Sequence, residues 1–259
     1  MKRNLKGKKI VVTRAEKQAK SLVDGIERAG GEALLFPLIE FAPVADQTEL
    51  KQAFQNLENY HWLVFTSTNA VDYFFDAAEE EKVKFYFYPD LKIATVGEKT
   101  KLQLEQRGYR TNFVPIQFTA EVLAENMDEN IRGKHILIPR SEKASDEYLE
   151  VFVKRGAIPH AINVYQNLKV AHKAEAVENL LAQKPDYITF TSPSTVQAFY
   201  DLLPEKEHTL NSVKIACIGP STAKRAEILG FSVNALASPH TVDGLLEALK
   251  NIEPHVQTT

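Results

Sequence analysis

The sequence predicts an α/β fold of two similar domains, each a parallel β-sheet flanked by helices. Two segments carry most of this prediction: residues 61–74 and 186–199 are each an apolar run that ends in Phe-Thr-Ser and continues into a helical pattern. Their Phe-Thr-Ser sequences lie 125 residues apart. Other segments repeat at nearly the same spacing, which indicates an internal duplication. Strand and helix patterns alternate within each copy, as is typical of parallel sheets.

The first repeated unit has the pattern strand, helix, strand. Residues 9–14 form its opening apolar strand, and the second copy begins with a similar strand at 135–140. The spacing of Thr13 and Glu16 also fits a capping box, in which Thr13 would cap the first helix.

The second repeated unit has the pattern strand, helix, strand, helix. It begins with the Phe-Thr-Ser strands, and its second strand at 92–97 matches 214–219. Thr119 and Thr241 are suited to the N-cap of the last helix in each copy. The order along the chain is therefore first unit, second unit, then both units again. Each of the two domains would have about 110 to 140 residues.

Composition excludes several classes of protein. The 259 residues are 44% hydrophobic and 25% charged, with a net charge of −3, as in ordinary globular proteins. No run of Lys or Arg is long enough for a nucleic-acid interface, and no window approaches the apolar length of a membrane span. The first residues lack the apolar stretch of a secretory signal, so we expect a cytoplasmic protein without nucleic-acid or membrane partners. The single cysteine, Cys217, lies in an apolar strand, where a buried thiol is expected.

Candidate binding residues follow the ends of the predicted strands. In an open parallel sheet, ligands bind outside the carboxyl ends of the strands. Helix N-termini gather there, and their partial positive charge favours carboxylate or phosphate groups. Each hydroxyl at these ends can also simply cap its own helix, and capping and binding are not exclusive. The candidates are Thr13, Arg14, Thr66, Ser67, Arg140, Thr191, Ser192, Ser221, Thr222 and Thr241.

Signatures of cofactor and metal sites are missing. Neither G-x-G-x-x-G after the first strand nor G-x-x-x-x-G-K-[ST] occurs, which disfavours nucleotide cofactors. The histidines show no i,i+4 pairs and have no partnering cysteines, so we expect no metal site. A G-x-S-x-G elbow is also absent, which counts against an α/β-hydrolase. We therefore expect no cofactor.

An ordered series of motifs resembles the uroporphyrinogen-III synthase family. The series covers nearly the whole chain, and its order is more specific than any single motif. The motifs are Val12-Thr-Arg14, Phe65-Thr-Ser-x-Asn-Ala-Val71, Val96-Gly-x-x-Thr100, Ile138-Pro-Arg140, Val164-Tyr-Gln166, Phe190-Thr-Ser-Pro-Ser-Thr-Val196, Ile218-Gly-Pro-Ser-Thr-Ala223 and His240-Thr-x-x-Gly-Leu245. Through these motifs Thr100 and Ser194 join the residues expected to bind substrate.

The resemblance implies that the chain leaves the first domain early, builds the second and then returns. Domain 1 is then 1–37 plus 168–259, and domain 2, inserted into it, is 38–167. The crossings lie near 37–44 and 164–170 and form a two-stranded linker. Each domain would combine the first unit of one copy with the second unit of the other. The duplication alone leaves a tandem arrangement of the two copies open.

The implied reaction converts hydroxymethylbilane, a linear tetrapyrrole with eight carboxylates, into uroporphyrinogen III. The enzyme, a hydro-lyase of haem and sirohaem biosynthesis, inverts the last pyrrole ring and releases water. Tyr165 matches the family's usual candidate for the residue that hydrogen-bonds to the departing hydroxyl. The resemblance also implies a monomer, in transient contact with the preceding enzyme of the pathway.

Two other interpretations remain open. A two-lobed cytosolic protein that binds a small anion without catalysis would show the same duplicated domains and helix N-termini. A nucleotide-dependent transferase would also have a doubly wound sheet, although the missing glycine motif counts against it. Formation of the type III isomer from hydroxymethylbilane distinguishes the synthase from the binding protein, and absence of saturable nucleotide binding in calorimetry would exclude the transferase.

Overall fold

The chain forms two compact units. The computed structural model describes residues 4–127, 130–173, 175–203, 210 and 213–252. Unit 1 comprises Met1–Glu40 and Leu168–Thr259, and unit 2 comprises Phe41–Asn167. Within the described residues each unit contains one five-stranded sheet, with buried clusters of apolar side chains that helices and strands share. The predicted α/β class is confirmed.

Unit 1 has the strand order β10-β9-β8-β1-β2, and its strands pair in parallel. The strands are β1 (Lys9–Val12), β2 (Glu32–Leu35), β8 (Tyr187–Phe190), β9 (Lys214–Cys217) and β10 (Val233–Leu236). The helices are α1 (Glu16–Arg28), α7 (Ala176–Ala182), α8 (Pro193–Leu202), α9 (Pro220–Ile228) and α10 (Val242–Asn251). The central strand β8 is buried along its whole length, because helices cover both faces of a parallel sheet.

Unit 2 has the strand order β3-β7-β6-β4-β5. Its strands are β3 (Ile39–Pro43), β4 (Trp62–Phe65), β5 (Lys92–Thr95), β6 (His135–Ser141) and β7 (Ile158–Lys169). Its α-helices are α2 (Thr48–Gln55), α3 (Thr68–Glu80), α4 (Glu98–Gln106), α5 (Ala120–Asn126) and α6 (Glu147–Lys154). Two short 3₁₀ turns, η1 (Leu57–Asn59) and η2 (Phe85–Phe87), precede β4 and β5.

Strand pairing decides which parts of the duplicated sequence share a sheet. β1 pairs with β8, with Val11 opposite Ile188. β4 pairs with β6, with Leu63 opposite Leu137. Each sheet thus combines the first repeated unit of one copy with the second repeated unit of the other, whereas a tandem arrangement would place β1 in one sheet with β4.

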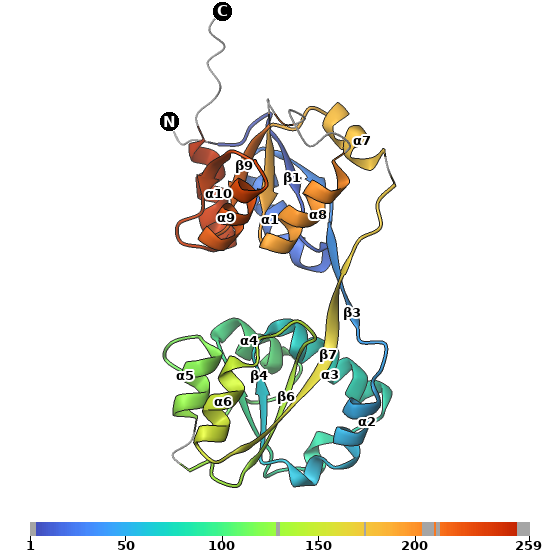
Figure 1. Cartoon of the computed structure of the whole chain (residues 1–259), viewed down its shortest axis with the longest axis vertical. Helices are drawn as coiled ribbons and strands as arrows, with labels where there is room; N and C mark the ends of the chain where they lie inside the picture. The colour runs from blue at the N-terminus through green and yellow to red at the C-terminus, as the bar shows by residue number, and fades with distance from the viewer. Residues whose placement is uncertain (1–3, 128–129, 174, 204–209, 211–212, 253–259) are drawn as a thin grey trace, which may run out of the picture. The chain divides into compact units, whose positions relative to one another are not determined.

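Helices lie on both faces of each sheet. In unit 2, α2 and α3 lie on one side of the sheet, and α5 and α6 lie on the other (Figure 1). The helices α2, α3 and α4 contribute side chains such as Phe74 and Leu104 to one buried cluster, while α5 and α6 contribute Leu123 and Phe152 to the other. In unit 1, α7, α8 and α9 cover one face, and α1 and α10 cover the other. None of the helices in the described ranges has the length and apolar content that a membrane span requires.

The strands β3 and β7 carry the chain from one unit to the other. They are neighbours in the sheet of unit 2. The backbone N–H of Val44 donates to the Val164 carbonyl at 3.4 Å, and that of Val170 donates to the Leu38 carbonyl at 3.1 Å, a pairing that fits antiparallel strands. β7 starts well before residue 164 because its first part pairs in parallel with β6. One element is therefore both a sheet strand and a crossing.

Candidate active site

Helix N-termini gather at the carboxyl ends of the strands, and hydroxyl side chains cap several of them. Ser67 accepts a hydrogen bond from the Ala70 N–H at the start of α3 (3.1 Å). Ser192 accepts the equivalent bond at the start of α8. Thr119 and Thr241 cap α5 and α10, as predicted. The helices α4 and α9 instead begin at the glycines Gly97 and Gly219, which offer no side-chain cap.

Tyr165 and Ser67 meet at the N-terminus of α3. The phenol oxygen of Tyr165, on β7, lies 3.3 Å from the Ser67 Oγ, although the two residues are 98 positions apart in the chain. The tyrosine side chain is 7% exposed. Its hydroxyl therefore lies at the positive end of a 13-residue helix, where negative charge that develops on a ligand is stabilised.

Two aromatic residues hold the ring of Tyr165, and the sequence analysis missed both. The Tyr73 ring on α3 stacks on it, with centroids 5.4 Å apart and 17° between the planes. Phe41 on β3 packs edge-on at 5.9 Å. The Tyr73 hydroxyl also donates to the Phe41 carbonyl at 2.6 Å. A sequence signal existed for Tyr73, which lies on the helix that Ser67 caps, but no local pattern indicates Phe41.

Arg140 lies at the same edge of the sheet as Tyr165. It is on β6, which pairs with β7, and the next residue, Ser141, is opposite Tyr165. Its guanidinium forms an ion pair with Asp146 and donates to the Ser145 carbonyl at 3.4 Å. Burial lowers the pKa of Arg140, but its hydrogen bonds and the Asp146 carboxylate raise the pKa by more than burial lowers it, so the net shift is upward. Arg140 is thus a permanent cation that already has a carboxylate partner. Thr66, next to Ser67, is half-buried.

Arg14 is the corresponding cation of unit 1, at the end of β1. Its Nε donates to the neutral Gln18 side chain at 3.2 Å, and no carboxylate among the described residues pairs with it. Burial lowers the pKa of Arg14, because a desolvated charge is costly when nothing compensates it. An anionic ligand would supply the missing compensation.

Hydroxyl groups gather at the start of α8 in the same unit. The Ser192 Oγ lies 2.9 Å from the Ser194 Oγ, and Thr191 is half-buried beside them. Ser221 is exposed in the first turn of α9. These groups, with the Thr241 cap, are where the sequence predicted them, at the carboxyl ends of β8, β9 and β10.

Three candidate hydroxyls are buried, so the structure lends no support to their predicted role as substrate ligands, which stays a prediction. Thr13 is fully buried, and its hydroxyl donates to the Thr189 carbonyl at 2.7 Å. Thr100 and Thr222 are 6% and 2% exposed on the inner sides of α4 and α9. The predicted capping box is also wrong, because α1 has Ala15 at its N-cap and no side-chain cap.

The largest pocket among the described residues lies in unit 2, at the end opposite to the carboxyl ends of the strands. It has a volume of about 930 Å³ and is lined by His61, His135 and His160, among others, near the amino ends of β4, β6 and β7. It contains none of the predicted binding residues. No group of three or more potential ligands among the described residues is arranged to hold a metal ion.

Comparison with known proteins gives one consistent family. The model of a family described as uroporphyrinogen-III synthase HemD matches residues 5–247. A porphyrin biosynthesis protein HemD of Ruminiclostridium josui is 29% identical over 97% of the chain, which spans half of that protein's length. A uroporphyrinogen-III synthase of Synechococcus elongatus is 28% identical, and the match covers 94% of the chain and 95% of the relative.

Solved structures show the same fold. A uroporphyrinogen-III synthetase of Helicobacter pylori aligns with a TM-score of 0.65 over 95% of the chain and 100% of its own, at 19% identity. A mutant uroporphyrinogen III synthase of Thermus thermophilus aligns with a TM-score of 0.61 over 95% of the chain and 98% of its own, at 16% identity.

Proposed function

Because the chain belongs to the uroporphyrinogen-III synthase family, we propose that it closes hydroxymethylbilane to uroporphyrinogen III, with inversion of the terminal pyrrole ring and loss of water. The observation that carries this proposal is the family match over residues 5–247. The chemistry is that of a lyase. The alternative of a non-catalytic anion-binding protein gains nothing from the relatives, which carry the name of the enzyme.

The chemical problem is one of positioning. Loss of the substrate hydroxyl leaves a reactive azafulvene, which closes to the uninverted isomer without help. To obtain the type III product, the enzyme holds the chain so that the substituted carbon of the terminal ring is attacked, and the resulting spiro intermediate rearranges. Pre-organised geometry of this kind is worth several kcal/mol.

Tyr165 is the proposed hydrogen-bond donor to the departing hydroxyl. Its position supports this role: the phenol lies at the N-terminus of α3, in hydrogen-bond reach of Ser67. A phenol O–H can donate a hydrogen bond to an oxygen atom. As the C–O bond breaks, negative charge grows on the leaving oxygen, and the hydrogen bond becomes stronger there than in the ground state.

Carboxylate binding is assigned to the exposed and half-buried groups of each strand edge, taken unit by unit. In unit 2 these are Thr66, Ser67 and Arg140, and in unit 1 they are Arg14, Thr191, Ser192, Ser194, Ser221 and Thr241. Arg14 is the strongest candidate, since its charge has no carboxylate partner among the described residues. Backbone N–H groups at the helix N-termini add further donors.

Four further properties stay predictions: a cytoplasmic location, a monomeric state, the lack of a cofactor, and contact with the preceding enzyme of the pathway.

Isomer analysis tests the central proposal directly. Freshly prepared hydroxymethylbilane is incubated with the protein, and the products are oxidised and separated by chromatography. Type III product in excess over the spontaneous type I supports the proposal, whereas type I alone, as in a blank without protein, contradicts it.

A further inference from the structure

An exposed apolar pair lies on the loop that leads into α5. Ile116 is 97% exposed and Phe118 is 59% exposed. The loop is held at both sides: the Thr95 N–H donates to the Phe113 carbonyl at 3.0 Å, and Thr119 caps α5. A large aromatic side chain held on an ordered loop and left open to water is a candidate contact surface.

Phe118 lies over the start of α4. A Cβ atom added to Gly97 would be 3.4 Å from the Phe118 Cγ. Gly97 is the N-cap of α4 and provides no side-chain cap. The apolar ring therefore lies beside helix N–H groups that carry partial positive charge and have no side-chain acceptor from the cap.

The duplicated loop in unit 1 has the same construction but different exposed residues. His240 lies over Gly219, since a Cβ atom added to this glycine would be 3.9 Å from the His240 Cγ. The bond from Thr119 N–H to the Gln117 carbonyl (2.9 Å) has its counterpart in the bond from Thr241 N–H to the Pro239 carbonyl (2.8 Å). The loop frame is common to both units, so neither Ile116 nor Phe118 is needed to build it.

This surface belongs to the same edge as Tyr165. β4 and β5 pair with Phe65 opposite Thr95, so α3 and α4 start side by side. Ser67 at the start of α3 is bonded to Tyr165, and Gly97 at the start of α4 is covered by Phe118. An extended ligand that reaches Tyr165 along this edge passes the Phe118 ring.

We propose that Phe118, flanked by Ile116, packs against the face of a pyrrole ring of the substrate and so positions the tetrapyrrole in unit 2. The inference rests on the proposed function and identifies a binding residue that positions the substrate. A pyrrole ring of this substrate is a flat apolar face with carboxylate side chains. Phe118 matches the face, and the neighbouring uncapped α4 N-terminus matches the carboxylates.

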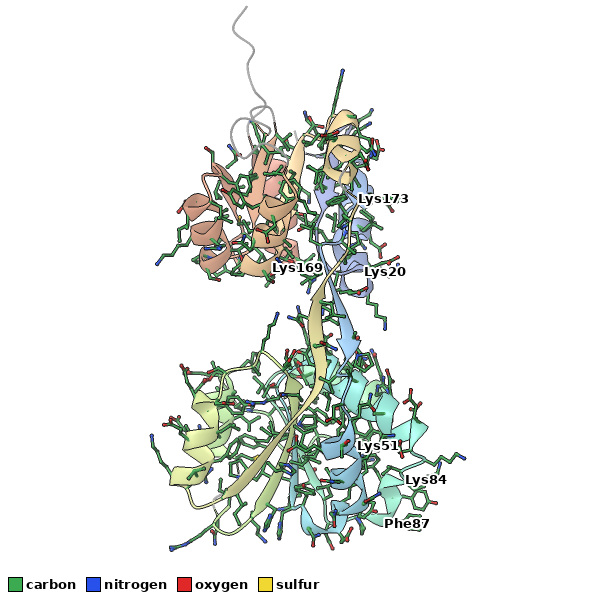
Figure 2. All side chains as sticks on the ribbon, turned by 45° about the vertical axis from the view of Figure 1, so that its right-hand side comes forward. Lys20, Lys51, Lys84, Phe87, Lys169 and Lys173 are labelled. Carbon is green, nitrogen blue, oxygen red and sulfur yellow. The ribbon has the colours of Figure 1, made fainter. Side chains whose placement is uncertain are left out.

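An exposed aromatic pair elsewhere in unit 2 provides the matched control. Tyr86 and Phe87 are 73% and 68% exposed on η2, which precedes β5 and thus lies at the amino edge of the sheet. Figure 2 shows Phe87 at the end of unit 2 away from the carboxyl ends of its strands. Exposure alone does not separate the two pairs, but their position relative to the helix N-termini does.

The test compares Phe118→Ala, Phe118→Leu and Phe87→Ala in the full chain. KM and kcat are measured for hydroxymethylbilane, and the inhibition constant is measured for uroporphyrinogen III. We expect Phe118→Ala to raise KM and the inhibition constant about tenfold with kcat changed less than about twofold. Phe118→Leu should fall in between, and Phe87→Ala should match the wild type. Circular dichroism verifies that each variant is folded.

The outcomes separate this inference from the proposed function. If the wild type makes the type III isomer and Phe118→Ala keeps wild-type KM and inhibition constant, the inference is overturned and the function stands. Equal effects of Phe118→Ala and Phe87→Ala also overturn it. If the wild type makes no type III isomer, the proposed function is overturned, and the inference about Phe118 is overturned with it.

Discussion

The rings of Tyr73 and Tyr165 lie nearly parallel, 5.4 Å apart between centroids and 17° between planes, and the hydroxyl of Tyr73 is bound to the Phe41 carbonyl. This stack joins α3, which Ser67 caps, to β7, which carries Tyr165. The phenol of Tyr165 is held at the helix N-terminus by packing as well as by its hydrogen bond with Ser67.

Replacement of Tyr165 by Phe should lower kcat by about 10²-fold, because it removes the donor to the departing hydroxyl and keeps the packed ring. The single changes Ser67→Ala, Ser192→Ala and Thr222→Ala should each have a smaller effect on turnover. Steady-state kinetics with isomer analysis gives the comparison. A fully active Tyr165→Phe enzyme would remove Tyr165 from the chemistry and leave the carboxylate sites unaffected.

Tyr73→Phe should cost about 1 kcal/mol of unfolding free energy through the lost bond to Phe41, with little change in kcat. Tyr73→Ala removes the stacked ring and should lower kcat about tenfold as Tyr165 becomes mobile. A double-mutant cycle tests whether Tyr73 affects kcat through Tyr165. In the Tyr165→Phe background, Tyr73→Ala should leave kcat unchanged; a full tenfold loss there would show that Tyr73 acts independently of Tyr165.

Arg14→Gln should raise KM for hydroxymethylbilane about tenfold, since a charge-assisted bond to a carboxylate is worth about 1.5–3 kcal/mol. Arg107→Gln is a suitable control, because Arg107 is already paired with Asp72 and Asp76. That variant should lose stability with KM unchanged. Kinetics at two salt concentrations add a second readout, in which the wild-type KM rises with salt more steeply than that of Arg14→Gln. An unchanged KM in Arg14→Gln would exclude substrate binding at this arginine.

Thr13→Val should lower the unfolding free energy by about 1 kcal/mol while KM stays at its wild-type value. The reason is the buried bond from the Thr13 hydroxyl to the Thr189 carbonyl, which joins β1 to β8. Chemical denaturation and kinetics on the same preparation give both quantities. A raised KM at unchanged stability would restore Thr13 as a substrate ligand.

Cys217 should resist alkylation in the folded protein at pH 8. Burial raises the pKa of this thiol to about 12, from an ordinary value of 9.0, so the reactive thiolate is scarce. The unfolded chain releases the thiol proton above about pH 9 and the folded chain does not. This contribution to stability is therefore complete below pH 9 and declines as the pH rises toward 12. Cys217→Ala, measured alongside, should lack this decline.

Much of the fold could be predicted from local sequence. The Phe-Thr-Ser corners predicted strands that turn into capped helices, and both Ser67 and Ser192 are N-caps. These features depend on neighbouring residues, so the sequence contains them directly. The role of Thr13 could not be predicted in this way, because its hydroxyl donates to the Thr189 carbonyl, 176 residues away in the chain.

The sequence by itself determined the duplication, the alternation of strands and helices, the family resemblance and the positions of the helix caps, because each depends on residue order or on contacts within a few residues. Only the tertiary structure decided that β1 lies beside β8 and β4 beside β6, and that Tyr165 reaches Ser67 between Phe41 and Tyr73. Such contacts join segments far apart in the chain. Hydrophobic burial and strand pairing select them, and neither is encoded at a single position.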